Sequence, residues 1–218
     1  DIKFLRKPCF KRGFFMCKLK SMSKRKPQKK KTPSFIEDNI RILEIGARGD
    51  GIAEYKDEKL FIPRTIQNET VKARIRPRKS GGYGGELLDI EEKSPHRVQP
   101  PCPYYEKCGG CSLQHISDEA YREWKEAKVR DILGRANTTP AEWCETIFIP
   151  PQTRRRATFA AFMHKGKVSV GYHQSRTHQI IDIENCLVLT PHLNDIARNL
   201  RPYLKDILPE NRPVSISL

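Results

Sequence analysis

The sequence has 218 residues, which is enough for one large domain or two small ones. Hydrophobic residues make up 37% and charged residues 31%, a composition typical of a globular body with a solvated tail, and no stretch approaches the roughly 18 apolar residues of a membrane span. The formal net charge is +15, and residues 1–33 hold 13 lysines and arginines against one aspartate.

Residues 1–34 are predicted to be a disordered basic tail, because Pro27, Pro33 and the lysines between them show no apolar period. Such a tail can bind nucleic acid by neutralising phosphates. The seven cysteines are an odd number and nothing marks secretion, which favours free or metal-bound thiols over disulfides. The sequence therefore indicates a cytoplasmic, monomeric protein without a membrane partner.

Five short strands punctuated by glycines are predicted next, at residues 40–45, 51–55, 59–62, 70–76 and 86–90. Five strands in so few residues favour a small barrel of the oligonucleotide-binding type over residues 35–95. Lys72, Arg74 and Arg76 alternate along one of the strands and share a face. That face is either a solvated strand surface or an RNA contact.

Three thiols, Cys102, Cys108 and Cys111, follow in the pattern C-x5-C-x2-C, with a glycine pair that lets the backbone wrap closely around a metal. A fourth ligand is needed. Cys186 is favoured over Cys144 because it follows a predicted strand at a loop, and His115 is a further candidate in a mixed zinc site. From spacing alone, tetrahedral zinc and a [4Fe–4S] cluster are both compatible with four thiolates.

The rest of the chain alternates helices and strands. A helix is predicted over residues 117–135, with Ser117 as its N-cap and a packing face at Ala120, Trp124, Ala127 and Ile132. A second helix begins at Thr190 with a proline at its first position. Strands are predicted at 158–163, 167–172, 179–183 and 214–218, and residues 164–166 between the first two fit a hairpin turn. Before them, Arg154, Arg155 and Arg156 form either a charged strand end or a phosphate-binding group.

Several motifs in order resemble the N-terminal half of the RNA (uracil-5-)-methyltransferases, in particular the 23S ribosomal RNA branch with an N-terminal TRAM domain. The motifs are Ile45-Gly46-Ala-Arg-Gly49-Asp-Gly51-Ile-Ala53, Phe61-Ile-Pro63, Cys108-Gly-Gly-Cys111-Ser-Leu-Gln114-His115, Arg154-Arg155-Arg156 and Ile181-Asp182-Ile183-Glu-Asn-Cys186. The resemblance implies that Cys102, Cys108, Cys111 and Cys186 hold a [4Fe–4S] cluster. It also implies that Lys72, Arg74, Arg76 and Arg154 to Arg156 face RNA, either 23S ribosomal RNA or transfer RNA.

The expected fold is mostly β with two or more helices (α+β). A TRAM-like barrel over residues 35–95 is followed by an incomplete central domain over residues 96–218. The 32 residues after Cys186 contain no glycine, so the S-adenosylmethionine-binding domain of the family is expected to be absent and no catalytic residue is assigned.

Three functions are compatible with these observations. The first is a truncated, inactive methyltransferase of the S-adenosylmethionine-dependent RNA uracil-5 class. The second is a self-standing RNA-binding module, and the third is a zinc-stabilised interaction protein.

Overall fold

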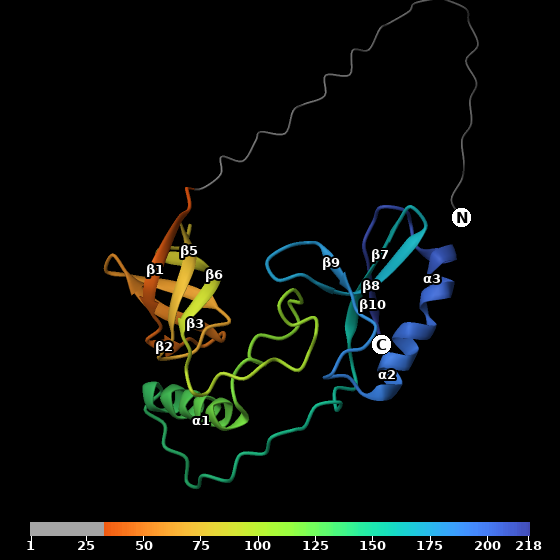
Figure 1. The fold of residues 1–218 in the computed structure, drawn as a ribbon. Helices are drawn as coiled ribbons and strands as arrows, with labels where there is room; N and C mark the ends of the chain where they lie inside the picture. The colour runs from red at the N-terminus through yellow and green to blue at the C-terminus, as the bar shows by residue number, and fades with distance from the viewer. Residues whose placement is uncertain (1–32) are drawn as a thin grey trace, which may run out of the picture. The chain divides into compact units, whose positions relative to one another are not determined.

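A computed structural model describes residues 33–218 (Figure 1). The predicted basic tail, except for its last two residues, lies outside the described residues, as do Cys9 and Cys17. The described part contains ten strands in two sheets and three helices. The predicted fold class, mostly β with at least two helices, is confirmed. The domain boundary between residues 95 and 96 stays a prediction.

The first sheet has six strands in the order β1-β5-β6-β4-β3-β2, and only β4 and β6 run parallel. The strands are β1 (Phe35–Arg41), β2 (Glu44–Ile45), β3 (Asp50–Tyr55), β4 (Glu58–Pro63), β5 (Thr70–Pro77) and β6 (Tyr83–Glu92). Alternation along β5 is regular, with Val71, Ala73 and Ile75 buried and the basic residues between them turned outward.

The sheet curls over its own hydrophobic face. Side chains from β1, β3, β4 and β5 form a single buried cluster that includes Ile40, Leu60 and Ile62. Phe35 of β1 and Tyr55 of β3 belong to strands that are not neighbours in the sheet, yet their ring centroids lie 5.6 Å apart. Tyr55 Oη also donates a 2.9 Å hydrogen bond to Glu37 Oε1 of β1. A sheet that encloses its core in this way has the character of a barrel.

The first strand begins at Phe35, five residues before the predicted start at Ile40. Two acidic residues interrupt the apolar alternation there and hide the strand from sequence analysis. The structure explains them, because Glu37 accepts the Tyr55 hydroxyl and Asp38 Oδ1 pairs with Lys72 Nζ at 2.8 Å. Asn39 has a φ of 55° at a register shift, so the pairing with β5 is also irregular at this point.

The second sheet is antiparallel, with the order β10-β7-β8-β9. Its strands are β7 (Thr158–His164), β8 (Lys167–His173), β9 (Ile180–Asp182) and β10 (Val214–Ser217). Lys165 and Gly166 have φ values of 50° and 70°, as a two-residue hairpin turn requires, which confirms the predicted β7–β8 hairpin.

Two short helices, α2 (Pro191–Asn199) and α3 (Arg201–Ile207), contribute to the core of the second sheet. The predicted helix start at Thr190 is confirmed. Leu193 and Ala197 of α2 and Leu204 of α3 are buried in one cluster with Phe159 and Val170 of the strands.

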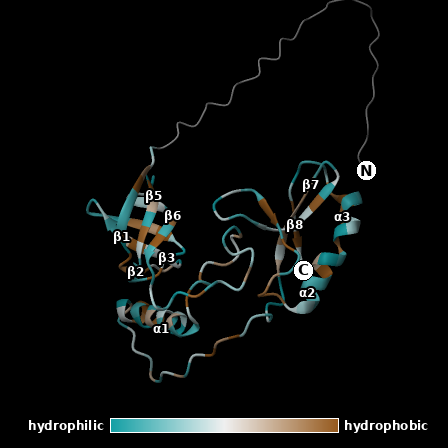
Figure 2. Cartoon of the chain, viewed as in Figure 1, coloured by the Kyte–Doolittle hydropathy of each residue, from teal (hydrophilic) through white to brown (hydrophobic). Residues whose placement is uncertain are grey.

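Helix α1 (Asp118–Arg135) begins as predicted, since Ser117 Oγ accepts the Ala120 amide at 3.4 Å. Ala120 and Trp124 pack against a small buried cluster, and Trp124 Nε1 donates to the Ile45 carbonyl at 3.1 Å. The predicted packing face is wrong in its second half, because Ala127 is exposed and Ile132 is 64% exposed. Figure 2 shows that α1 is largely hydrophilic. None of the helices within residues 33–218 is long and apolar enough to cross a membrane.

Candidate metal centre and nucleic-acid interface

The first three predicted ligands lie in the segment between β6 and α1. Hydrogen bonds from Tyr105 N to Cys102 O (3.1 Å) and from Cys108 N to Tyr104 O (2.7 Å) close successive turns. Gly110 N then donates to Cys108 Sγ at 3.3 Å. A side chain at Gly109 would meet the His173 carbonyl oxygen at 2.9 Å, so the close approach of this turn to β8 requires a glycine. The turn and the second sheet are therefore packed backbone to backbone.

Cys186 reaches the same place from the loop between β9 and α2. The side chain of Asn194, a buried residue of α2, accepts from the Cys186 amide at 2.9 Å and donates to the Cys186 carbonyl at 3.1 Å. This reciprocal pair fixes the Cys186 backbone. Asn194 is a positioning residue that sequence analysis did not identify.

All four predicted cysteines line one small cavity of about 40 Å³, shared with Tyr172, Gln114 and Arg154 among others. Burial raises the pKa of the Cys108 and Cys111 thiols, and the neighbouring thiols add to the rise in both. For Cys111, a hydrogen bond from Gln114 and the charge of Arg154 oppose it. The structure therefore brings Cys102, Cys108, Cys111 and Cys186 together around one space.

The other candidate ligands lie elsewhere. Cys144 is exposed and lines a separate groove beside Trp143. His115 does not line the cysteine cavity, and its Nδ1 is 2.6 Å from the Tyr105 hydroxyl. Within residues 33–218, no group of three or more histidine, cysteine or acidic side chains is arranged to hold a single metal ion.

A buried ion pair stabilises the cysteine segment, which is the stretch of residues 93–117 between β6 and α1. Glu69 is fully buried, and Arg97 Nη2 donates to its Oε2 at 2.8 Å while also donating to the Arg64 carbonyl at 2.8 Å. Arg64 in turn donates to the Glu106 carbonyl at 2.6 Å. Burial, followed by the charge of Arg97, lowers the pKa of His115 beside this pair to about 4. Glu69 and Arg97 are 28 residues apart, and no local pattern in the sequence marks them as partners.

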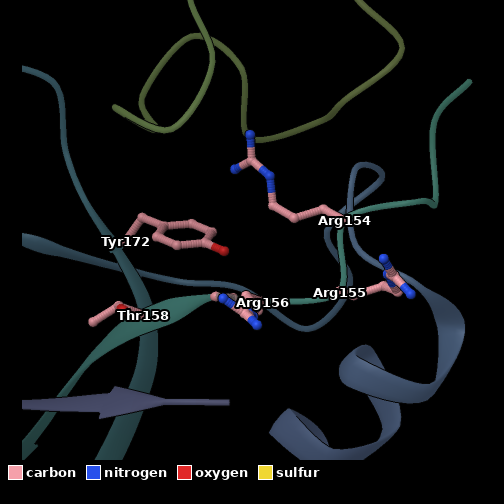
Figure 3. Close-up of a pocket in the computed structure, with 6 residues that line it drawn as sticks. Arg154, Arg155, Arg156, Thr158 and Tyr172 are labelled. Carbon is pink, nitrogen blue, oxygen red and sulfur yellow. The ribbon is translucent and has the colours of Figure 1, made fainter. Parts of the chain in front are cut away.

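Arg154, Arg155 and Arg156 line an open pocket of about 740 Å³ together with Thr158 and Tyr172. Figure 3 shows Arg154 extending beside the ring of Tyr172, whereas Arg155 points away from that ring. Among the described residues, none of the three guanidinium groups forms an ion pair with a carboxylate. Three unpaired arginines in one pocket can bind an anion through bidentate hydrogen bonds.

The basic residues of β5 have partners. Lys72 pairs with Asp38, and Arg74 Nη1 and Arg76 Nη2 lie 2.9 and 3.2 Å from the same oxygen of Glu86. Arg74 and Arg76 also line a groove of about 850 Å³, whose other basic residues include Arg48, Arg64, Arg78 and Arg176. Sequence analysis missed Arg48, Arg64 and Arg176, because they come from separate loops and form no run.

Comparison with known proteins indicates the family to which this chain belongs. No family model matches the chain. An uncharacterised RNA methyltransferase of Brucella melitensis is 37% identical over 180 residues, which are 82% of this chain and 41% of that protein. The 23S rRNA (uracil(1939)-C(5))-methyltransferase of a Shewanella species is 34% identical over 189 residues, which are 84% of this chain and 40% of the Shewanella protein.

A solved structure, the tRNA (uracil-54, C5)-methyltransferase of Pyrococcus abyssi in complex with S-adenosyl-L-homocysteine, is 20% identical with a TM-score of 0.47. The match covers 78% of this chain and 37% of the Pyrococcus chain. This chain belongs to the RNA (uracil-5-)-methyltransferase family, as its motifs predicted. It spans about 40% of the length of the curated relatives that it matches.

Proposed function

We propose that this chain is the RNA-binding and iron–sulfur-binding part of an S-adenosylmethionine-dependent RNA (uracil-5-)-methyltransferase. The observation that carries the RNA-binding part is the pocket of Arg154, Arg155 and Arg156, whose three guanidinium groups have no carboxylate partner among residues 33–218. The relatives supply the reaction class, since the Shewanella protein is named for methylation of uracil in 23S ribosomal RNA.

RNA contacts are assigned to two surfaces, a principal one and a secondary one. The arginine pocket is the principal one, because its cations are free to bind phosphate. Lys72, Arg74 and Arg76 form a secondary surface on the TRAM-like barrel of residues 35–95. Asp38 and Glu86 already neutralise part of their charge. The substrate is 23S ribosomal RNA, with transfer RNA as the alternative.

The cysteine cavity is proposed to hold a [4Fe–4S] cluster, with zinc as the alternative. Four thiol groups line one space, as thiolate ligation of such a cluster requires. The cavity wall also contains Gln114 Oε1 and the Tyr172 hydroxyl, two buried polar atoms without a partner among the described residues. The cluster would supply cross-links between the cysteine segment and the loop after β9. Asn194 would hold Cys186 in place for it.

Methyl transfer belongs to the whole protein in this proposal. The matched region covers about 40% of the relatives, and no residue described here is assigned to catalysis. The part played by residues 1–218 is to hold RNA while other parts bind S-adenosylmethionine and attack the uracil ring. The 218-residue polypeptide alone is therefore expected to be inactive as a methyltransferase.

The test uses the 218-residue polypeptide and a fluorescein-labelled 23S ribosomal RNA fragment. Anisotropy should show binding that weakens as salt rises, and Arg155→Ala with Arg156→Ala should weaken it without lowering the melting temperature. Tritiated S-adenosylmethionine should leave no 5-methyluridine above background. Binding indifferent to both salt and these arginines would favour the zinc-stabilised interaction protein.

A further inference from the structure

The cysteine cavity and the arginine pocket share one wall. Arg154 and Tyr172 line both spaces. Arg155 and Arg156 line the pocket but not the cavity, and none of the four cysteines lines the pocket. The side chains of Arg154 and Tyr172 therefore adjoin both the group that the cysteine sulfurs bind and the ligand that the arginine pocket binds.

The backbone holds this wall in place. Arg154 N donates to the Val188 carbonyl at 3.0 Å, and Thr190 N donates to the Arg154 carbonyl at 3.1 Å. These bonds tie Arg154 to the segment that directly follows Cys186. Tyr172 lies in β8, and its ring stacks on buried Phe159 with centroids 5.2 Å apart. Both residues are thus fixed to the core that positions the fourth cysteine.

The chemistry of the wall suits a negatively charged occupant. The Tyr172 hydroxyl is buried and has no partner among residues 33–218, although buried hydroxyl groups normally have one. A tyrosine hydroxyl is a neutral hydrogen-bond donor at neutral pH. Arg154 adds a permanent positive charge that acts on both Tyr172 and Cys111.

We propose that Arg154 and Tyr172 couple the cysteine cavity to the arginine pocket, so that one-electron reduction of the cluster weakens RNA binding. This inference rests on the proposed [4Fe–4S] site and RNA contact. An added electron increases the negative charge beside Arg154, which then binds an RNA phosphate less well. Dithionite, a low-potential reductant, supplies the electron in the test. The electron resides on the iron–sulfur core, and no bond forms or breaks.

Linkage makes the effect reciprocal. If reduction raises the dissociation constant of RNA by some factor, RNA must make reduction harder by the same factor. A coupling of about tenfold lies within the usual range for two communicating sites. For a one-electron couple, tenfold corresponds to a shift of about 59 mV in midpoint potential. RNA should therefore move the potential about this far in the negative direction.

The experiment titrates the anaerobically reconstituted 218-residue chain with dithionite, with and without a single-stranded RNA oligonucleotide. Arg154→Gln and Tyr172→Phe should each lower the RNA-free potential, because each removes a group that stabilises negative charge on the cluster. Arg154→Gln should also shrink the RNA-induced shift, and Arg154→Lys should restore most of it. The matched control is Arg155→Gln, which should weaken RNA binding but leave the RNA-free potential unchanged.

The possible failures can be told apart. A chain without iron and sulfide after reconstitution would overturn the proposed cluster and the coupling with it. Failure to bind RNA in either redox state would overturn the proposed RNA contact. A loaded, RNA-binding chain whose potential is the same with and without RNA would overturn the coupling alone. Equal RNA-free shifts in the Arg154→Gln and Arg155→Gln variants would overturn the assignment to the shared wall.

Discussion

The six-stranded sheet and the cysteine segment of residues 93–117 are stabilised in different ways. The sheet encloses aliphatic side chains from four of its strands, of which Leu60, Ile62 and Ile75 are fully buried. The cysteine segment buries only two hydrophobic side chains, Tyr105 and Ile116. The sheet therefore has a hydrophobic core of its own, whereas the segment depends on a buried ion pair and on its proposed cluster.

Cys108→Ala should produce the largest effect and should confine it to the cysteine segment. Loss of one of four thiolates should abolish the absorption near 400 nm and make residues 101–115 sensitive to protease, because ligation there replaces a core. The sheet should stay protected. Cys144→Ala removes an exposed thiol outside the cavity and serves as the control. Unchanged colour and unchanged protection in Cys108→Ala would contradict the proposed ligand set.

Glu69→Gln should come next, because it breaks the ion pair that supports the segment. The substitution leaves the Arg97 guanidinium largely buried without its counter-charge, which should cost about 3 kcal/mol of unfolding free energy. Asp131→Asn is the matched control. It breaks the exposed Asp131–Arg135 pair of α1 and should cost less than about 0.5 kcal/mol. Urea denaturation measures both, and equal costs would show that the buried pair has no special role.

Acid should weaken the same region through His115. Its folded-state pKa of about 4 lies below the usual 6.5, so the unfolded chain binds the proton more readily. The contribution is fully present above pH 6.5 and is lost as the pH falls towards 4, by about 3 kcal/mol in total. Arg97 and Arg64 oppose protonation of His115, whereas Glu69 favours it.

The pH test compares unfolding free energies at several pH values between 4 and 7. His115→Asn should flatten this part of the profile, whereas His192→Asn, which changes an exposed histidine of α2, should not. A profile of unchanged slope in His115→Asn would assign the acid sensitivity to another group.

The smallest effect is expected on the sheet, where Arg76→Ala should weaken RNA binding less than Arg155→Ala does. Glu86 already pairs with Arg76, whereas Arg155 has no carboxylate partner among the described residues. We expect about a twofold loss for Arg76→Ala and about a tenfold loss for Arg155→Ala, measured by anisotropy at one salt concentration. The reverse order would make the barrel the principal RNA surface.

Local signals predicted much of the fold. Ser117 marked the start of α1, Thr190 and Pro191 marked the start of α2, and the turn before Lys167 marked the hairpin. Each depends on residues adjacent in the chain. The start of β1 was missed because Glu37 and Asp38 are explained only by partners on β3 and β5.

The parts of the candidate site that depend on local spacing could be predicted from the sequence, whereas the parts that depend on long-range pairing could not. The spacing of Cys102, Cys108 and Cys111 pointed to one ligand cluster, and a loop position favoured Cys186 as the fourth member. The alternation of Arg74 and Arg76 correctly placed them on one face. It could not show that Glu86 lies beside them, because that depends on the register between β5 and β6. Asn194 and Glu69 were missed because their partners, Cys186 and Arg97, are brought to them only by the tertiary fold.

The reciprocal hydrogen bonds between Asn194 and Cys186 have a consequence for the order of events during synthesis. Cys186 follows Cys111 by 75 residues, and the helix that fixes its backbone is made later still. At about 5–20 residues per second, a ribosome needs several seconds to add that length. For this interval the nascent chain presents three of the four proposed ligands without the fourth. The proposed four-thiolate site is therefore complete only after α2 has emerged from the ribosome and folded.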